Sequence, residues 1–178
     1  MPLNVASMSS RTRAEWRFGL VRSGRPYRPS TANPPASPRG VVWARIDLDA
    51  HDRASAVHRE LELQIVEQIS SNGRIALSPG PGDPPFDIAF AADDSRAVIV
   101  EVKSLPVGAE VQQLRLGLGQ VLDYRAKLGE RLSVTPIVAV DREPPDSAHW
   151  QRVYDHAGVG LSWPPDLWNR IRAAIAAL

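Results

Sequence analysis

The sequence predicts an α/β fold in which a helix, three strands, a second helix and a fourth strand follow one another, with a helix–strand–helix extension at the C-terminus. Short apolar, β-branched segments alternate with two long segments of helical periodicity. A strand–helix–strand step across residues 97–140 also implies a right-handed crossover between parallel strands. With 178 residues and 43% hydrophobic content, the chain is sufficient for one domain of ordinary size and a tail.

The first half of the domain is predicted to contain one long helix and several short strands. Residues 41–48 alternate in the manner of a short strand, and the helical segment that follows ends at the Asn72–Gly73 signal for a helix C-terminus. A loop rich in proline and glycine and a hairpin-type turn then separate three strand-like runs. These three runs are residues 74–78, 86–91 and 97–105.

The second half is predicted to continue with a long helix that ends at Gly129, followed by an apolar strand. A short helix, a further strand and a C-terminal helix with Pro165 near its first turn complete the chain. The predicted elements are residues 107–129, 134–140, 144–158, 159–163 and 164–178.

The composition excludes several classes of protein and site. The absence of cysteine excludes disulfides, thiolate zinc sites and cysteine nucleophiles. No run approaches the roughly 18 apolar residues of a membrane span, and the N-terminus lacks the apolar region of a secretory signal. We therefore expect a soluble, cytoplasmic protein without a membrane partner.

Residues 1–40 differ in charge from residues 41–178. The first segment carries seven arginines and one acid, Glu15, for a net charge of +6, whereas the rest carries 14 basic and 19 acidic side chains, for −5. The first segment also holds six of the 16 prolines, and such a composition buries too little surface to offset its ordering entropy. We expect a disordered basic arm, which is either a dispensable tail or a segment that pairs with phosphates.

The segment AVIVEVKSL, residues 97–105, places an acid and a base on a strand that is otherwise apolar. Glu101 and Lys103 are two positions apart and therefore face the same side of the sheet, and burial of a charged pair costs several kcal/mol, by rough estimate, unless the geometry or a metal compensates. If the neighbouring strand begins at Asp87, two carboxylates meet and a divalent ion such as Mg²⁺ relieves their repulsion. The Val102 carbonyl can supply a third ligand, and Lys103 can orient a water or stabilise developing negative charge. The alternative is a surface ion pair on an edge strand.

The first long helix presents two titratable side chains on its apolar face. At 100° per residue, His58 and Glu62 fall among Val57, Leu61 and Ile65. Glu62 is expected either to ligate a metal, directly or through water, or to form a buried structural pair. His58 is expected to be a hydrogen-bonded core histidine, a partner of Glu62 or a contact for phosphate.

The second long helix carries a polar stripe formed by Gln113, Gly117, Gln120 and Tyr124 at spacings of four, three and four. A glycine inside a helix costs roughly 1 kcal/mol, so its presence indicates that something approaches closely. Arg115 adds positive charge nearby. The stripe is either part of a site or a partly solvated face whose glycines allow close helix packing.

Taken together, these segments make the chain similar to the PD-(D/E)xK nuclease superfamily. The matching pieces are PFD ending at Asp87, EVK at 101–103, and GQVLDY with Gln120 and Tyr124, which is similar to the Q-x-x-x-Y signature of exonuclease-type members. The resemblance covers roughly residues 54–140 and departs from the family name at residue 86, which is Phe instead of Pro.

The resemblance implies a restriction-endonuclease-like core and a function in phosphodiester hydrolysis. It implies that Asp87 and Glu101 bind Mg²⁺ or Mn²⁺, that Lys103 assists the attacking water, and that Glu62 completes the site. Gln120 and Tyr124 would then support the site or the nucleic-acid backbone. The expected function is a metal-dependent DNA nuclease, and the alternative is a catalytically inactive nucleic-acid-binding or assembly module. By the same analogy, the partners are DNA and either a second copy of the chain or a separate recognition subunit.

Overall fold

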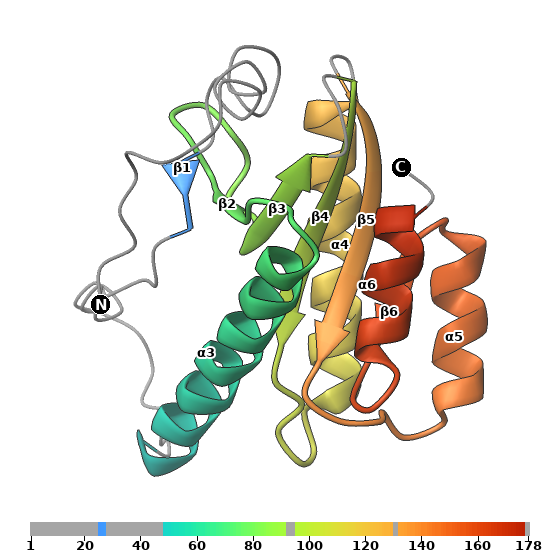
Figure 1. The fold of residues 1–178 in the computed structure, drawn as a ribbon. Coiled ribbons are helices and arrows are strands. Elements are labelled where there is room, and N and C mark those ends of the chain that lie inside the picture. Colours follow the sequence, from blue (N-terminus) through green and yellow to red (C-terminus); the bar gives the residue numbers. More distant parts are fainter. Residues whose placement is uncertain (1–24, 28–47, 92–94, 130–131, 177–178) are drawn as a thin grey trace, which may run out of the picture.

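A mixed six-stranded sheet between two layers of helices forms the fold in the computed structural model (Figure 1). The structure describes residues 25–27, 48–91, 95–129 and 132–176. The strands follow the order β1-β2-β3-β4-β5-β6. Helices α3 and α6 pack on one face of the sheet, and α4 and α5 pack on the other.

The element order confirms the predicted α/β class and the C-terminal helix–strand–helix extension. The bounds are β1 Arg25–Pro26, α3 Leu48–Ser71, β2 Leu77–Ser78, β3 Ile88–Ala91, β4 Arg96–Lys103, α4 Glu110–Leu128, β5 Ser133–Val140, α5 Ser147–His156, β6 Gly160–Ser162 and α6 Leu167–Ala176. None of the helices in the described part of the chain combines the length and the apolar character needed to cross a membrane.

The direction of strand pairing changes at β4. Strands β1 to β4 pair antiparallel in chain order, whereas β4 pairs parallel with β5, and β5 with β6. A parallel connection needs a crossover, and α4 supplies it between β4 and β5. The predicted parallel step across residues 97–140 is therefore confirmed.

Helix α3 packs through the apolar stripe that its periodicity predicted. Leu61, Ile65 and Ile69 are buried against the sheet, and Gly73 follows the helix in a left-handed conformation at φ +73°, which glycine adopts without steric cost. The prediction is wrong at Val57, which is 41% exposed. The buried part of the α3 stripe begins one turn later, at Leu61.

Strand β4 lies in the centre of the sheet and is buried on both faces. Val98, Val100 and Val102 belong to the core cluster that contains the α3 residues, whereas Ala97 and Ile99 belong to the cluster that contains α4 residues. Because side chains alternate along a strand, Glu101 and Lys103 follow Ala97 and Ile99 toward α4. The interpretation of Glu101–Lys103 as a surface pair on an edge strand is therefore wrong.

The structure describes only part of residues 1–48. The predicted strand at residues 41–48 lies outside the described residues except for Leu48, which begins α3. In the expected disordered arm, the described residues 25–27 are ordered, because Arg25 and Pro26 pair with Ser78 and Leu77 of β2. The rest of the arm lies outside the described residues.

Candidate metal centre

Asp87 lies where β3 begins and β4 approaches its end. The antiparallel ladder pairs Ile88 with Val100, so Asp87 lies one step beyond it, opposite Glu101. Residues opposite each other on neighbouring strands have Cβ atoms about 4.5 to 5.5 Å apart. The Asp87 carboxylate accepts a hydrogen bond from the Val102 amide at 2.7 Å, and this bond holds Asp87 at the unpaired end of β3.

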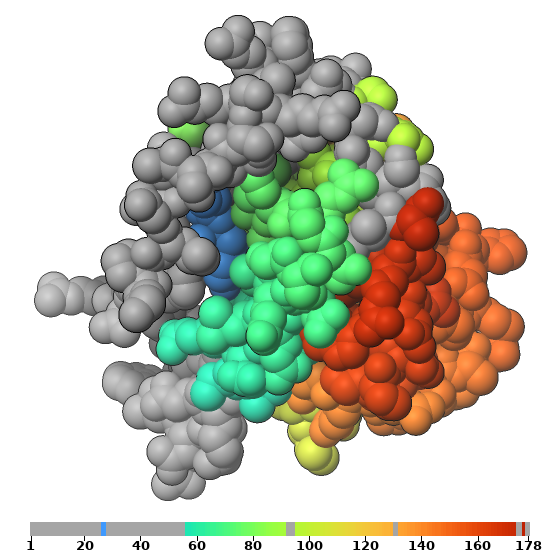
Figure 2. All heavy atoms as spheres, in the orientation of Figure 1, coloured from blue at the N-terminus to red at the C-terminus, as the bar shows by residue number. Residues whose placement is uncertain are grey.

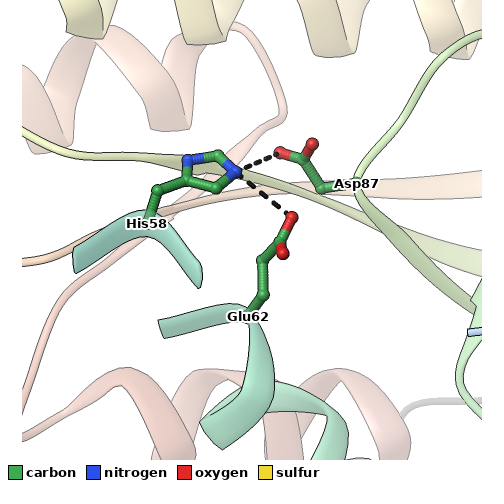
Figure 3. Close-up of side chains that lie close together, drawn as sticks. All are labelled: His58, Glu62 and Asp87. Carbon is green, nitrogen blue, oxygen red and sulfur yellow. Dashed lines mark hydrogen bonds and ion pairs between the residues drawn. The ribbon is translucent and has the colours of Figure 1, made fainter. Parts of the chain in front are cut away.

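Helix α3 brings two more side chains to Asp87 from the other face of the sheet. His58 and Glu62 are one helical turn apart, and the Nε2 atom of His58 lies 3.2 Å from Glu62 Oε1 and 3.9 Å from Asp87 Oδ2. Figure 3 shows the imidazole directed at both carboxylates. One nitrogen and two oxygens of this group lie within 4.8 Å of one another, a spacing at which they could hold a metal ion.

Glu101 and Lys103 form a buried ion pair on the α4 side of Asp87. Lys103 Nζ lies 2.5 Å from Glu101 Oε1, and Glu101 is only 2% exposed. Its other oxygen, Oε2, is buried without a hydrogen-bond partner among the described residues. A buried carboxylate oxygen without a donor is costly, so a cation at this position would offset a penalty that the fold already carries.

Helix α4 approaches this pair closely at a glycine. A Cβ atom on Gly117 would lie 3.1 Å from Val138 Cγ1 and 3.3 Å from Lys103 Cγ. The glycine predicted to allow close approach therefore contacts the lysine stem and the sheet. A Cβ atom on Gly119 would meet nothing within 4 Å, so helix packing does not account for the second glycine.

The two opposed carboxylates both hold protons more strongly than usual. Burial, together with the neighbouring Asp87 carboxylate, raises the pKa of Glu101 from 4.5 to about 7. Burial also raises the pKa of Asp87, although the Val102 amide and His58 act against it. Cation binding requires the deprotonated carboxylates, so a cation beside these two acids would lower both pKa values.

On the α3 side of the site, the pKa values favour the charged forms of Glu62 and His58. Burial tends to raise the pKa of Glu62, but hydrogen bonds from His58 and Tyr27 outweigh it and leave this pKa below its usual value. Burial tends to lower the pKa of His58, but Glu62 and Asp87 outweigh it and raise this pKa. The Glu62 carboxylate is therefore ready to act as an anionic ligand.

The Val102 carbonyl also faces this part of the molecule. The N–H and C=O of one strand residue point to the same side of the strand, and the Val102 amide points to Asp87. Beyond the last β3 pair, the carbonyl has no ladder partner on that side in the register of the described strands. Its predicted role as a third ligand is compatible with this geometry.

Gln120 and Tyr124, two residues of the polar stripe on α4, lie close to the segment that leads into Asp87. Gln120 donates to the Tyr124 hydroxyl at 3.2 Å, and that hydroxyl donates to the Pro85 carbonyl at 3.2 Å, two residues before Asp87. Burial, with the Glu101 charge, raises the pKa of Tyr124 to about 12. Gln113 is half-buried earlier on the helix, and no hydrogen bond or ion pair described in the structure joins its side chain to the cluster.

A groove runs along the outer side of α4 beside Gln120 and Tyr124. Its volume is about 450 Å³. Two of its lining residues, Arg115 and Lys127, are basic, and Lys127 is paired with Asp123 at 2.6 Å. Gly119 also lines the groove. Arg115, which was predicted to contact nucleic acid, therefore lies on the same surface as the glycine that helix packing does not explain.

Asp87 thus joins two groups of predicted site residues that lie on opposite faces of the sheet. His58 and Glu62 lie on one side, and Glu101 with Lys103 lies on the other. The residue missing from the sequence prediction is Tyr27, whose hydroxyl donates to Glu62 Oε2 at 2.6 Å. An isolated tyrosine in an arginine- and proline-rich segment carries no periodic signal, so the contact of Tyr27 with Glu62, 35 residues later, could not be predicted.

Comparisons of the chain with protein-family models, with curated proteins and with solved structures returned no match.

Proposed function

We propose that this chain is a metal-dependent nuclease that hydrolyses phosphodiester bonds in DNA. The observation that carries the proposal is the position of Asp87, opposite the buried Glu101–Lys103 pair and within ligand distance of His58 and Glu62. The order α3, β2, β3, β4, α4, β5 supports a restriction-endonuclease-like core of the PD-(D/E)xK type.

The donor set fits a divalent ion. Asp87, Glu101, Glu62 and the Val102 carbonyl offer hard oxygen atoms, which suit Mg²⁺ and Mn²⁺. The buried and unpartnered Oε2 of Glu101, on the strand position opposite Asp87, supports a cation beside these two acids. An imidazole suits transition metals better than Mg²⁺, so the position of His58 favours Mn²⁺ of the two ions.

A bound divalent ion would lower the pKa of a water molecule and neutralise charge on the phosphate. The part assigned to Lys103 is electrostatic. Its ammonium group is held in place by Glu101 and by the contact of its stem with Gly117. A fixed positive charge in a water-poor site stabilises negative charge that develops on a phosphate oxygen, and it does so without reorganisation.

The groove on α4 is the proposed path for the nucleic-acid backbone. Arg115 and Lys127 offer positive charge to phosphates, and Gly119 leaves room for a strand to approach the helix. Residues 41–178 carry a net charge of −5, which opposes binding to a polyanion. The cations on the groove and the +6 arm are the proposed compensation.

A cleavage assay tests the proposal. The protein is incubated with duplex and single-stranded DNA and with RNA, in Mg²⁺, in Mn²⁺ and in EDTA. We expect metal-dependent cleavage of DNA that EDTA abolishes, and a loss of at least about 100-fold in Lys103→Met, because removal of one such electrostatic group costs 10² to 10³ in rate.

Arg152→Met, on the exposed surface of α5, provides a control for the loss of one positive charge and should cleave like the wild type. Cleavage by Lys103→Met at the wild-type rate would refute the assigned role. Binding of DNA without cleavage in any metal would instead favour the inactive binding module.

A further inference from the structure

Residues 25–27 place part of the basic arm against the candidate metal centre. Strand β1 pairs with β2 at the sheet edge, and the Tyr27 amide donates to the Ala76 carbonyl at 3.1 Å. The Tyr27 side chain packs against the core cluster that contains the buried residues of α3. Figure 2 shows residues 25–27 directly beside α3 on the surface of the molecule.

The Tyr27 hydroxyl completes the set of hydrogen bonds around Glu62. Glu62 Oε2 accepts from Tyr27 at 2.6 Å, and Glu62 Oε1 lies 3.2 Å from His58 Nε2. The terminal torsion of a glutamate side chain is broad and soft, so one partner on each oxygen defines the plane of the carboxylate. Oε1 is thereby kept on the side of His58 and Asp87, where the three possible ligand atoms gather.

We infer that Tyr27 is a positioning residue for Glu62 and that residues 25–27 belong to the metal centre instead of to a passive tail. This inference rests on the proposed function, because it requires Glu62 to be a metal ligand. Partners that hydrogen-bond to metal ligands orient them, and their loss typically lowers metal affinity 10- to 100-fold. Metal binding and the docking of residues 25–27 on α3 should consequently stabilise each other, since such coupling is reciprocal.

The test compares two Tyr→Phe variants that each remove one hydroxyl group. Tyr27→Phe removes the donor to Glu62, whereas Tyr154→Phe removes a buried donor to the Leu114 carbonyl at 2.7 Å, between α5 and α4. Mn²⁺ affinity is measured by calorimetric titration of the full chain, and the visible spectrum of added Co²⁺ reports on the ligand field. We expect Tyr27→Phe to bind Mn²⁺ about tenfold more weakly and to change the Co²⁺ spectrum.

The control should behave differently in both measurements. Tyr154→Phe should unfold at lower urea concentration than the wild type while keeping its Mn²⁺ affinity and its Co²⁺ spectrum. A purely structural role of Tyr27 would give the same result as this control. A second series in the Glu62→Gln background tests the coupling directly, because Tyr27→Phe should have little further effect on affinity once the carboxylate is absent.

The outcomes separate this inference from the proposed function. The role of Tyr27 would be overturned if the wild type binds Mn²⁺ and Tyr27→Phe has the same Mn²⁺ affinity and the same Co²⁺ spectrum. The metal site itself would remain supported. Equal effects of Tyr27→Phe in the wild-type and Glu62→Gln backgrounds would also overturn it. A wild-type chain that binds neither Mn²⁺ nor Co²⁺ would remove the metal site and, with it, this inference.

Discussion

Replacing Glu101 with glutamine is expected to stabilise the metal-free protein near neutral and alkaline pH. Glutamine has nearly the shape of the protonated glutamate, and its carbonyl oxygen can still accept a hydrogen bond from Lys103. It removes the negative charge that Glu101 carries in a position that is 2% exposed, opposite Asp87. The substitution therefore removes the carboxylate repulsion and desolvation that a metal is proposed to offset.

The magnitude follows from the pKa of Glu101, which burial and Asp87 raise from 4.5 to about 7. A carboxyl group whose pKa is raised in the folded state contributes its full stability below the unfolded pKa and loses it as the pH rises through the folded pKa. Each pKa unit corresponds to about 1.4 kcal/mol. The wild type should thus lose up to about 3 kcal/mol through Glu101 between pH 4.5 and pH 8, and Glu101→Gln should not.

Urea unfolding of both proteins in EDTA, at about pH 5 and about pH 8, measures this difference. His58 also has a raised pKa, and its contribution to stability falls with rising pH in the same sense. Because His58 is present in both proteins, the difference between them reports on Glu101 and on its interaction with Asp87. Added Mn²⁺ should reverse the order at about pH 8, since a ligand that binds the folded state stabilises it. An equal difference in stability at both pH values would show that Glu101 does not lose a proton between them in the folded protein.

Three further substitutions have defined outcomes. Gly119→Ala should raise the free energy of unfolding by about 1 kcal/mol, because its Cβ atom meets nothing within 4 Å; no gain in urea unfolding would contradict this. Gly117→Ala, in the same helix, should lower the free energy of unfolding by about 1 to 2 kcal/mol, although alanine has the same advantage in helix propensity there. The reason is that its Cβ atom would lie 3.1 Å from Val138 Cγ1. A stability at or above that of the wild type would contradict this. Asp87→Asn should fold, because its amide oxygen can still accept the hydrogen bond from the Val102 amide. Calorimetric titration should nevertheless show that the variant binds Mn²⁺ at least tenfold more weakly. An affinity equal to that of the wild type would show that Asp87 is not a ligand.

Strong patterns in the sequence were sufficient to predict the central elements of the fold. The apolar run at 97–105 predicted β4, because a strand buried on both faces needs apolar residues at nearly every position. The 3.6-residue periodicity likewise predicted α3 and α4 within a few residues of their observed bounds. The direction in which Glu62 points followed from the same periodicity, and the Glu62 side chain is only 13% exposed.

Weak or long-range signals could not be predicted in the same way. Strand β1 contains two residues and pairs with β2 about 50 positions later, so it offers no alternation from which to infer a strand. The exposure of Val57 depends on where α3 first meets the sheet, and a helical wheel carries no information about that point. The position of His58 near Asp87 likewise depends on how α3 crosses the end of β3.

The proposed metal site places a divalent cation beside the Asp87 carboxylate, with Glu62 on the α3 side or Glu101 on the α4 side as a further ligand. X-ray diffraction from crystals grown with Mn²⁺, recorded at a wavelength where manganese scatters anomalously, tests this most directly. We expect an anomalous peak at coordination distance, about 2.0 to 2.6 Å, from the Asp87 carboxylate and from at least one of the two glutamates. Crystals soaked to saturation that show no peak beside Asp87, or a peak only elsewhere on the protein, would contradict it.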